Sequence, residues 1–292
     1  MNDRRYPVRP FDPALIGDFF QGRGISSVEL LPLGRGNTNY KLVLTGGDAY
    51  VLRIYTHGDV QRETYVQDLV RDLVTVPEEI FRGCSWSVFS FLEGDVLQDT
   101  PEHSGAAAQA LIRISSVVLA SPGFIEMDGR ISGFSFGGAK GFILESLENP
   151  EVSAWLGPQG VASVREVLKR EDVRLAELDA GSRLVHGDFN PTNILIKDGV
   201  VSGVLDWEFC HSGSPYMDIG NLLRHTGPEH HALIESGLRA CGMDLPADWR
   251  ERAELVGLTN QFEFLTSARS GAFKRRCVAR ISGFTQRYDR AG

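Results

Sequence analysis

Cysteine is scarce in this chain of 292 residues, which holds four cysteines and no Cys-x-x-Cys pair. This spacing argues against a disulfide framework and a zinc site, and it is typical of reduced thiols in the cytoplasm. Apolar runs long enough to span a bilayer are also missing. Arg4 and Arg5 are not followed by an apolar stretch, so we expect no signal peptide. The sequence therefore predicts a soluble, cytoplasmic protein without a membrane segment.

An excess of positive charge is absent as well. The chain carries 38 acidic and 30 basic residues, with a net charge of −8. Phosphate backbones are bound by basic surfaces, so we do not expect nucleic acid as the main partner. The acidic balance is compatible with a cationic ligand, and equally with any soluble protein. Repeats are absent too, and the length suits two lobes that share a cleft.

The first part of the chain has the pattern of a β-rich lobe. Alternating apolar residues over 40–44 and 50–54, joined by Gly46 and Gly47, predict a β-hairpin. An amphipathic helix is predicted over 59–73, and one or two further strands before 94. From Pro101 onward the pattern is mainly helical. We therefore expect a boundary between two lobes within 93–101.

The densest chemistry lies in "LVHGDFNPTNILIKDGVVSGVLDWEF", residues 184–209. Two short apolar runs flank Asp198-Gly199, a pair that favours a primed hairpin turn. Such a hairpin brings Asn193 and Asp206 together at one end, with Asp188 on the loop beside them. Carboxylate and amide oxygens of this kind can hold Mg²⁺.

The spacing H-x-D-x-x-x-x-N followed by a distal Asp is that of the protein-kinase catalytic loop and metal-binding Asp. The segments "HGDFNPTN", "VLDWE" and "GSPYMDIG" resemble the aminoglycoside phosphotransferase / choline kinase family more closely than protein kinases. The resemblance covers about residues 30–224. It implies a protein-kinase-like two-lobe fold of the α+β class. Residues 1–95 would form a nucleotide-binding lobe, a five-stranded antiparallel sheet with one helix, and 96–292 a larger, mainly helical lobe for catalysis and acceptor binding.

The resemblance also implies roles in the central segment. Asp188 would be the catalytic base that accepts the proton of the substrate hydroxyl, and His186 would brace its loop. Asn193 and Asp206 would hold Mg²⁺ on the phosphates of ATP. Each residue alone would fit a loop cap or a buried structural histidine, but four at this spacing favour a functional site.

Expected nucleotide contacts lie in the first lobe. The Gly-rich turn in "LGRGNTNY" could offer backbone N–H groups to phosphates, although alone it is equally an ordinary β-turn. By resemblance its contacts are Gly34, Gly36, Asn37 and Asn39.

Arg53 takes the strand position of the kinase lysine and faces away from the apolar side of its strand. Glu63, on the flank of the helical stripe, is its expected partner; the alternative is a solvated Glu near the helix N-terminus. The backbone from Ser90 to Leu92 would meet adenine.

Acceptor contacts are the least defined part of the sequence. Glu208, two residues beyond Asp206 on the same expected strand, is a candidate contact for a cationic acceptor. Asp218 is expected to cap a helix that starts at Ile219. In "RHTGPEHH" the Gly-Pro pair interrupts the histidines, which favours a loop over a metal site.

We therefore expect Mg·ATP-dependent transfer of the γ-phosphate to a hydroxyl of an aminoglycoside-like or other small polar acceptor, as in resistance-type members of the family. A metabolic kinase for choline, ethanolamine or homoserine is the alternative, because "GNTNY" is similar to the nucleotide loop of homoserine kinases. A non-catalytic nucleotide-binding module is less favoured, since the base and both metal ligands are present. The sequence does not determine which acceptor is used, whether the nucleotide is ATP or GTP, or the oligomeric state.

Overall fold

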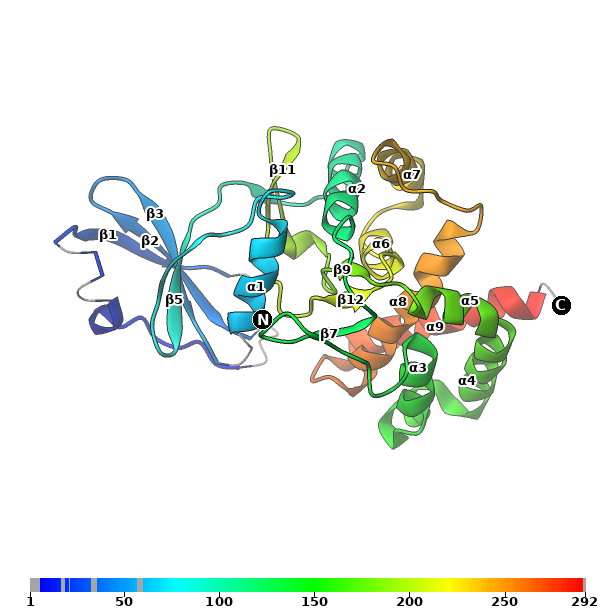
Figure 1. The fold of residues 1–292 in the computed structure, drawn as a ribbon. Coiled ribbons are helices and arrows are strands. Elements are labelled where there is room, and N and C mark those ends of the chain that lie inside the picture. The colour runs from blue at the N-terminus through cyan, green and yellow to red at the C-terminus, as the bar shows by residue number, and fades with distance from the viewer. Residues whose placement is uncertain (1–5, 17–18, 21, 33–35, 57–59, 291–292) are drawn as a thin grey trace.

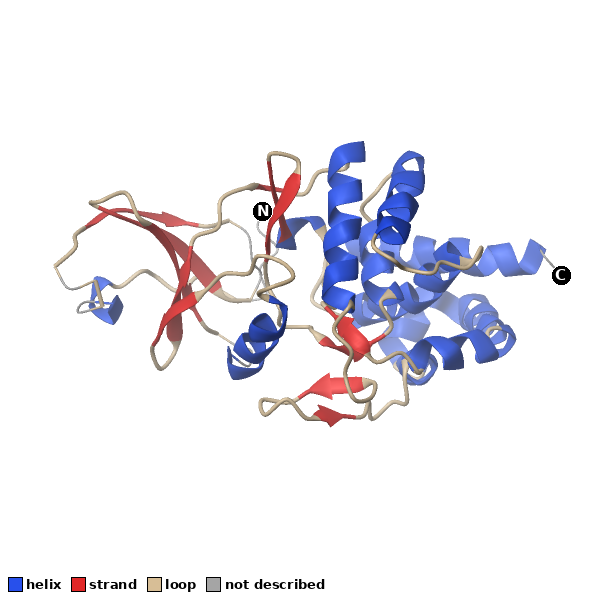
Figure 2. Cartoon of the chain, turned by 45° about the horizontal axis from the view of Figure 1, so that its top comes forward, coloured by secondary structure: helices blue, strands red, loops and turns tan. Residues whose placement is uncertain are grey.

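The fold, taken from a computed structural model, is described for residues 6–16, 19–20, 22–32, 36–56 and 60–290. It has two lobes, as expected (Figure 1). Figure 2 shows the large sheet on the left and most helices on the right, where the C-terminus lies. The predicted α+β class is confirmed.

The N-terminal lobe is a five-stranded antiparallel sheet with strand order β1-β2-β3-β5-β4. Its elements are η1 (Pro13–Ile16), β1 (Ile25–Leu30), β2 (Thr38–Leu44), β3 (Ala49–Ile54), α1 (Val60–Val70), β4 (Glu79–Arg82) and β5 (Trp86–Ser90). The predicted hairpin is β2–β3, and its apolar residues Leu42 and Leu52 are fully buried. They pack with Val88 and with Ile16 of η1 in a small core.

Helix α1 is the predicted helix, but it ends at Val70, so Leu73 lies in the turn beyond it. Its apolar face does not join the core of the sheet. Val66 and Val70 are fully buried in the large core of the C-terminal lobe. Beyond the helix, the carbonyl oxygen of Thr75 accepts a hydrogen bond of 2.9 Å from the N–H of Val204. Helix α1 is therefore packed against the C-terminal lobe.

The C-terminal lobe is mainly helical. Its helices are α2 (Pro101–Ser115), α3 (Ala139–Leu147), α4 (Pro150–Arg170), α5 (Asp172–Asp179), α6 (Tyr216–Leu223), α7 (His231–Ala240), α8 (Trp249–Thr266) and α9 (Gly271–Arg290), with short η2 (Pro191–Asn193) and η3 (Pro228–His230). Two small sheets lie among them. One has the order β11-β10-β6, from β11 (Val200–Val204), β10 (Ile194–Lys197) and β6 (Asp95–Val96). The other has the order β8-β7-β12-β9, from β8 (Ile131–Ser132), β7 (Gly123–Ile125), β12 (His211–Gly213) and β9 (Arg183–Val185).

The hairpin β10–β11 positions the central segment as predicted. Asp198 and Gly199 have φ values of 53° and 75°, the two left-handed residues of a primed turn. Ile194 pairs with Val204, which brings the flanking residues Asn193 and Asp206 to the same end. The lobe boundary after residue 95 stays a prediction, and β6, which straddles it, pairs with β10.

The C-terminal lobe differs from the sequence-based expectations at three points. The strand expected through Trp207 ends at Val204, because Asp206 turns the backbone into the left-handed region with φ of 62°. The expected loop around 224–231 contains η3, and His231 begins α7. The short strands β7, β8 and β12 were not anticipated, since segments of two or three residues carry no periodicity.

None of the helices in the described ranges is long and apolar enough to cross a membrane. The cytoplasmic location stays a prediction.

Helices α6 and α8 cross closely at Gly220, where an added Cβ would lie 2.5 Å from the carbonyl oxygen of Ala253. We predict that Gly220→Ala lowers the free energy of unfolding by about 1–3 kcal/mol, because the two helices must separate. Gly283→Ala is the matched control: its Cβ would meet nothing within 4 Å, so the change should be neutral or stabilising by up to ~1 kcal/mol. Urea unfolding measures both, and equal effects would contradict the close crossing.

Candidate active site

The catalytic loop is anchored by a buried carboxylate, that of Asp218 on α6. Its oxygens accept hydrogen bonds from the backbone N–H groups of His186 (2.7 Å) and Gly187 (2.9 Å). Asp218 was expected to cap the helix at Ile219, which is wrong. The helix begins at Tyr216, and the Asp218 side chain points back to the loop instead. Gly187 needs its glycine, because its φ is 82° and a Cβ would lie 2.2 Å from the carbonyl oxygen of Phe209.

His186 is fully buried and joins the catalytic loop to the segment before Asp206. Its Nδ1 accepts a hydrogen bond from the N–H of Asp188 at 3.2 Å, and its Nε2 lies 2.9 Å from the carbonyl oxygen of Leu205. One nitrogen accepts and the other donates, which is the pattern of a neutral imidazole. A side chain enclosed in this way cannot touch an acceptor, so the geometry suits the predicted bracing role.

Both carboxylate oxygens of Asp188 are held by asparagines. Oδ1 accepts from Nδ2 of Asn190 at 2.7 Å, and Oδ2 accepts from Nδ2 of Asn193 at 3.0 Å. Sequence reasoning missed Asn190, whose only local signal is its place two residues after Asp188. Because Nδ2 of Asn193 is directed at Asp188, its Oδ1 is the atom left to coordinate a cation.

Arg53 forms the expected ion pair with Glu63 and a second one with Asp206. Its guanidinium nitrogens lie 3.3 Å from Oε2 of Glu63 and 3.4 Å from Oδ1 of Asp206. Burial alone would lower the pKa of Arg53, but the two carboxylates outweigh it, so the pKa rises above its ordinary value. The Arg53 side chain is 14% exposed and that of Asp206 33%, so the cation is enclosed while the carboxylate remains accessible.

The carboxylates of Glu63, Asp206 and Glu208 lie together, each offering one oxygen within 4.8 Å of the others. Carboxylates next to an asparagine amide form a donor set of the kind that Mg²⁺ takes, so the residues present fit the predicted metal. Glu208, predicted as an acceptor contact, is placed beside the carboxylates that would hold the metal. Its charge also raises the pKa of Arg53.

Three of the four contacts predicted in the Gly-rich turn lie at or just before the start of β2. Gly34 lies outside the described residues, and Gly36 directly precedes the turn into β2. Asn37 is buried, and its Oδ1 accepts from the N–H of Thr56 at 2.8 Å. Asn39 pairs with Arg53 across β2 and β3.

Two further predicted contacts lie where the sheet meets the connector. Ser90 ends β5, and its Oγ accepts from the N–H of Glu78 at 2.9 Å. Leu92 packs its Cδ1 against Gly203, where a Cβ would come within 2.8 Å. All of these nucleotide roles stay predictions.

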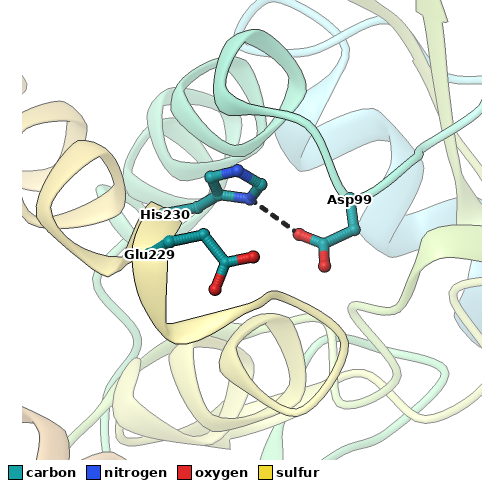
Figure 3. A group of neighbouring side chains, drawn as sticks. All are labelled: Asp99, Glu229 and His230. Atoms are coloured by element: carbon teal, nitrogen blue, oxygen red, sulfur yellow. Dashed lines mark hydrogen bonds and ion pairs between the residues drawn. The ribbon is translucent and has the colours of Figure 1, made fainter.

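A second group of convergent side chains lies outside this site (Figure 3). Asp99 accepts a hydrogen bond of 2.8 Å from Nδ1 of His230 and one of 2.9 Å from the N–H of Gly227, with Glu229 beside them. The hydrogen bond from His230, with that from Gly227, lowers the pKa of Asp99. These contacts tie the segment before α2 to the segment before α7.

The two lobes, the buried anchor and the Asp188 loop define a protein-kinase-like fold. The chain belongs to the phosphotransferase enzyme family, whose model matches residues 27–255. The predicted resemblance is thereby confirmed.

Individual relatives are more distant. A hygromycin-B 4-O-kinase of Escherichia coli is 24% identical over 200 residues, which covers 61% of this chain and only 56% of that enzyme. The structure of a thermostable mutant of aminoglycoside phosphotransferase APH(4)-Ia, in complex with AMP-PNP and hygromycin B, superposes with a TM-score of 0.66 at 19% identity. This covers 94% of this chain and 98% of that one. The macrolide 2'-phosphotransferase MphH of Brachybacterium faecium gives a TM-score of 0.65 at 15% identity, over 93% and 98% of the two chains. At these identities the structures show the shared fold alone.

The anchor predicts a pH dependence of stability. Burial raises the pKa of Asp218 to about 6, although the hydrogen bonds from the two N–H groups oppose this. An acid with a higher pKa in the folded state contributes stability below its unfolded pKa near 4, and loses it as the pH rises through about 6. We predict that the unfolding free energy of the wild type, relative to Asp218→Asn, falls between pH 4 and 7 in urea titrations. A rise over this range would show that the hydrogen bonds to Asp218 outweigh its burial.

Proposed function

We propose that the protein is a small-molecule kinase that transfers the γ-phosphate of ATP to a hydroxyl group, with Mg²⁺ as the metal. The observation that carries this proposal is the geometry around Asp188, whose two oxygens are fixed by Asn190 and Asn193. A carboxylate held at both oxygens is oriented before the acceptor arrives. Phosphoryl transfer depends mainly on positioning and charge neutralisation, which such an arrangement supplies.

Each residue of the site then has one task. Asp188 accepts the proton of the acceptor hydroxyl while the hydroxyl oxygen bonds to the γ-phosphorus of ATP, and the bond between that phosphorus and the β–γ bridging oxygen breaks to release ADP. Oδ1 of Asn193 and the carboxylate of Asp206 would hold Mg²⁺, which would supply neutralisation of charge on the phosphates. Glu208, beside Asp206, is placed to serve the same metal. Arg53 donates to phosphate oxygens from the sheet, and Glu63 keeps its guanidinium in place.

The adenine ring would contact the connector between the lobes. No hydrogen bond within the described residues engages the backbone N–H of Leu92, so this donor is available to a ring nitrogen. Phe91 is held in place by Lys41, whose Nζ lies 4.0 Å from its ring centroid. Both observations support the predicted role of residues 90–92.

The acceptor is a small hydroxylated molecule. An aminoglycoside-like compound is one candidate, supported by the hygromycin kinase among the relatives. A hydroxy amino acid such as homoserine is the second candidate. The two differ in charge, because the first is a polycation and the second carries a carboxylate.

The roles of the two aspartates can be separated. We predict that Asp188→Asn lowers turnover by about 10²–10⁴-fold, because the general base is lost, while affinity for Mg·AMP-PNP is kept. Asp206→Asn should lose Mg²⁺-dependent nucleotide affinity as well; asparagine is chosen because it tolerates the left-handed backbone at this position. Coupled ADP release and calorimetry measure the two quantities. Asp72→Ala, at an exposed carboxylate without a hydrogen-bonding partner among the described residues, is the control.

The assay should cover aminoglycosides, other hydroxylated antibiotics, choline, ethanolamine, homoserine and small sugars. Turnover on one class that disappears in Asp188→Asn would support the reaction and the base together. Equal nucleotide affinities in the two variants would contradict the assignment of Asp206 to the metal. Tight ATP binding with no turnover on any compound would favour a nucleotide-binding module instead.

A further inference from the structure

A cluster of basic and aromatic side chains lies on the helices that follow the catalytic segment. Helix α6 packs against α8, and α8 packs against α9 (Figure 1). The members come from the end of α6, the end of α8, the turn after it and the first half of α9. We call this set the arginine cluster: Arg224, Phe264, Arg269, Phe273, Arg276 and Arg280.

Within the arginine cluster, guanidinium groups and rings alternate. The Arg224 guanidinium lies 5.5 Å from the centroid of Phe264, and that of Arg276 lies 5.3 Å from Phe273. Arg269 contacts both rings, at 5.0 and 4.5 Å. The two rings meet edge to face at 5.3 Å. Cation–π contacts hold the planes of the guanidinium groups and leave N–H edges for a ligand.

The arginine cluster begins next to the catalytic loop. One turn before Arg224 on α6, Nδ2 of Asn221 donates a hydrogen bond of 3.0 Å to the carbonyl oxygen of Gly187. Asp188 is near enough to Arg224 for its negative charge to raise the pKa of Arg224, against the lowering caused by burial. A molecule bound to Arg224 therefore lies beside the proposed base, in the C-terminal lobe rather than at the sheet that carries Arg53.

The ion pairs of the described residues leave two guanidinium groups of the arginine cluster without a carboxylate partner. Among residues of the described ranges, neither Arg224 nor Arg280 forms an ion pair with a carboxylate. The polar contacts of their side chains within those ranges are with each other and with a histidine: a nitrogen of Arg280 lies 3.5 Å from the carbonyl oxygen of Arg224, and Nε of Arg224 lies 3.4 Å from Nε2 of His225. Burial and then Arg280 lower the pKa of Arg224 to about 10. Cations crowded in this way are stabilised by an added anion.

We propose that Arg224 and Arg280, framed by Phe264 and Phe273, bind a carboxylate or phosphate group of the phosphoryl acceptor. This inference rests on the proposed function and narrows its acceptor to hydroxy compounds that carry an anionic group. A guanidinium binds either anion through paired N–H donors. A polycationic aminoglycoside would meet like charges at this position, which disfavours it as the acceptor. Of the two candidate classes, the structure thus favours the hydroxy acid.

Turnover on matched compounds tests the charge preference. Glycerate and homoserine provide a carboxylate, and glycerol 3-phosphate provides a phosphate; glycerol and homoserinol are their counterparts without the anion. Kanamycin and hygromycin B serve as polycations. We expect turnover on at least one of the two anionic groups and none on the polycations. The carboxylate and phosphate compounds identify which anion the site takes.

Variants then locate the anion. Arg224→Ala and Arg280→Ala should each raise KM for the anionic acceptor about 10-fold to 100-fold, the effect of losing a charged hydrogen bond, with little change in kcat or in KM for ATP. Arg224→Lys keeps the charge and should recover part of the affinity. Arg275→Ala is the matched control on α9: it is exposed, and no ion pair or ring contact places it in the cluster.

A binding measurement separates this inference from the proposed function. With the nucleotide site saturated by Mg·AMP-PNP, inorganic phosphate and malonate are titrated by calorimetry into the wild type, Arg224→Ala and Arg275→Ala. Binding that is lost in Arg224→Ala alone supports the anion subsite even if every acceptor is silent. The inference would be overturned if no anion binds, or if anion binding is the same in Arg224→Ala as in the wild type. It would also be overturned by turnover on a polycation whose KM is unchanged in Arg224→Ala.

Discussion

The hydrogen bonds from the His186 and Gly187 backbone to the Asp218 carboxylate are the contact on which the site depends. These hydrogen bonds attach the loop that carries Asp188 to α6, a helix in the middle of the larger core. The same helix continues to Asn221, which holds the carbonyl oxygen of Gly187, and to Arg224. One short helix therefore sets the position of the base and of the proposed acceptor subsite. A carboxylate buried for this purpose is stabilised by its N–H donors and destabilised by desolvation, and the raised pKa shows that desolvation is the larger effect.

Arg53 connects the two lobes electrostatically. It lies on the sheet, while Glu63 belongs to a helix packed on the C-terminal core and Asp206 follows a strand of the C-terminal lobe. The arginine therefore meets carboxylates from two separate elements at one point. In the proposed function, the sheet would supply the guanidinium to one side of the phosphate chain, and the C-terminal lobe would supply the oxygen ligands for a metal on the other side.

The sequence predicted those elements that depend on residues close to one another in the chain. Alternation predicted β2 and β3, Asp198-Gly199 predicted the primed turn, and the spacing from His186 to Asp206 predicted the central site. The task of Asp218 was missed because its partners are distant in sequence, 31 and 32 residues away. Arg224 and Arg280 were missed for the same reason: α6 and α9 come together only through packing on α8. The early end of β11 follows from the left-handed backbone of Asp206, which a strand pattern does not reveal.

The pairing of β6 with β10 has a mechanical consequence. The chain leaves the sheet at Ser90 and pairs with the hairpin β10–β11 from Asp95 onward, so only residues 91–94 lie between the sheet and that hairpin. Gly94, with φ of 148°, takes a backbone conformation that other residues rarely adopt. Because α1 is packed in the core of the C-terminal lobe, the segments that join it to β3 and β4 also cross between the sheet and that lobe. A change in the angle of the sheet must therefore be taken up there as well as in residues 91–94. Asp188, Asn193 and Asp206 all lie beyond residue 94, so such a change would leave their mutual positions unaltered.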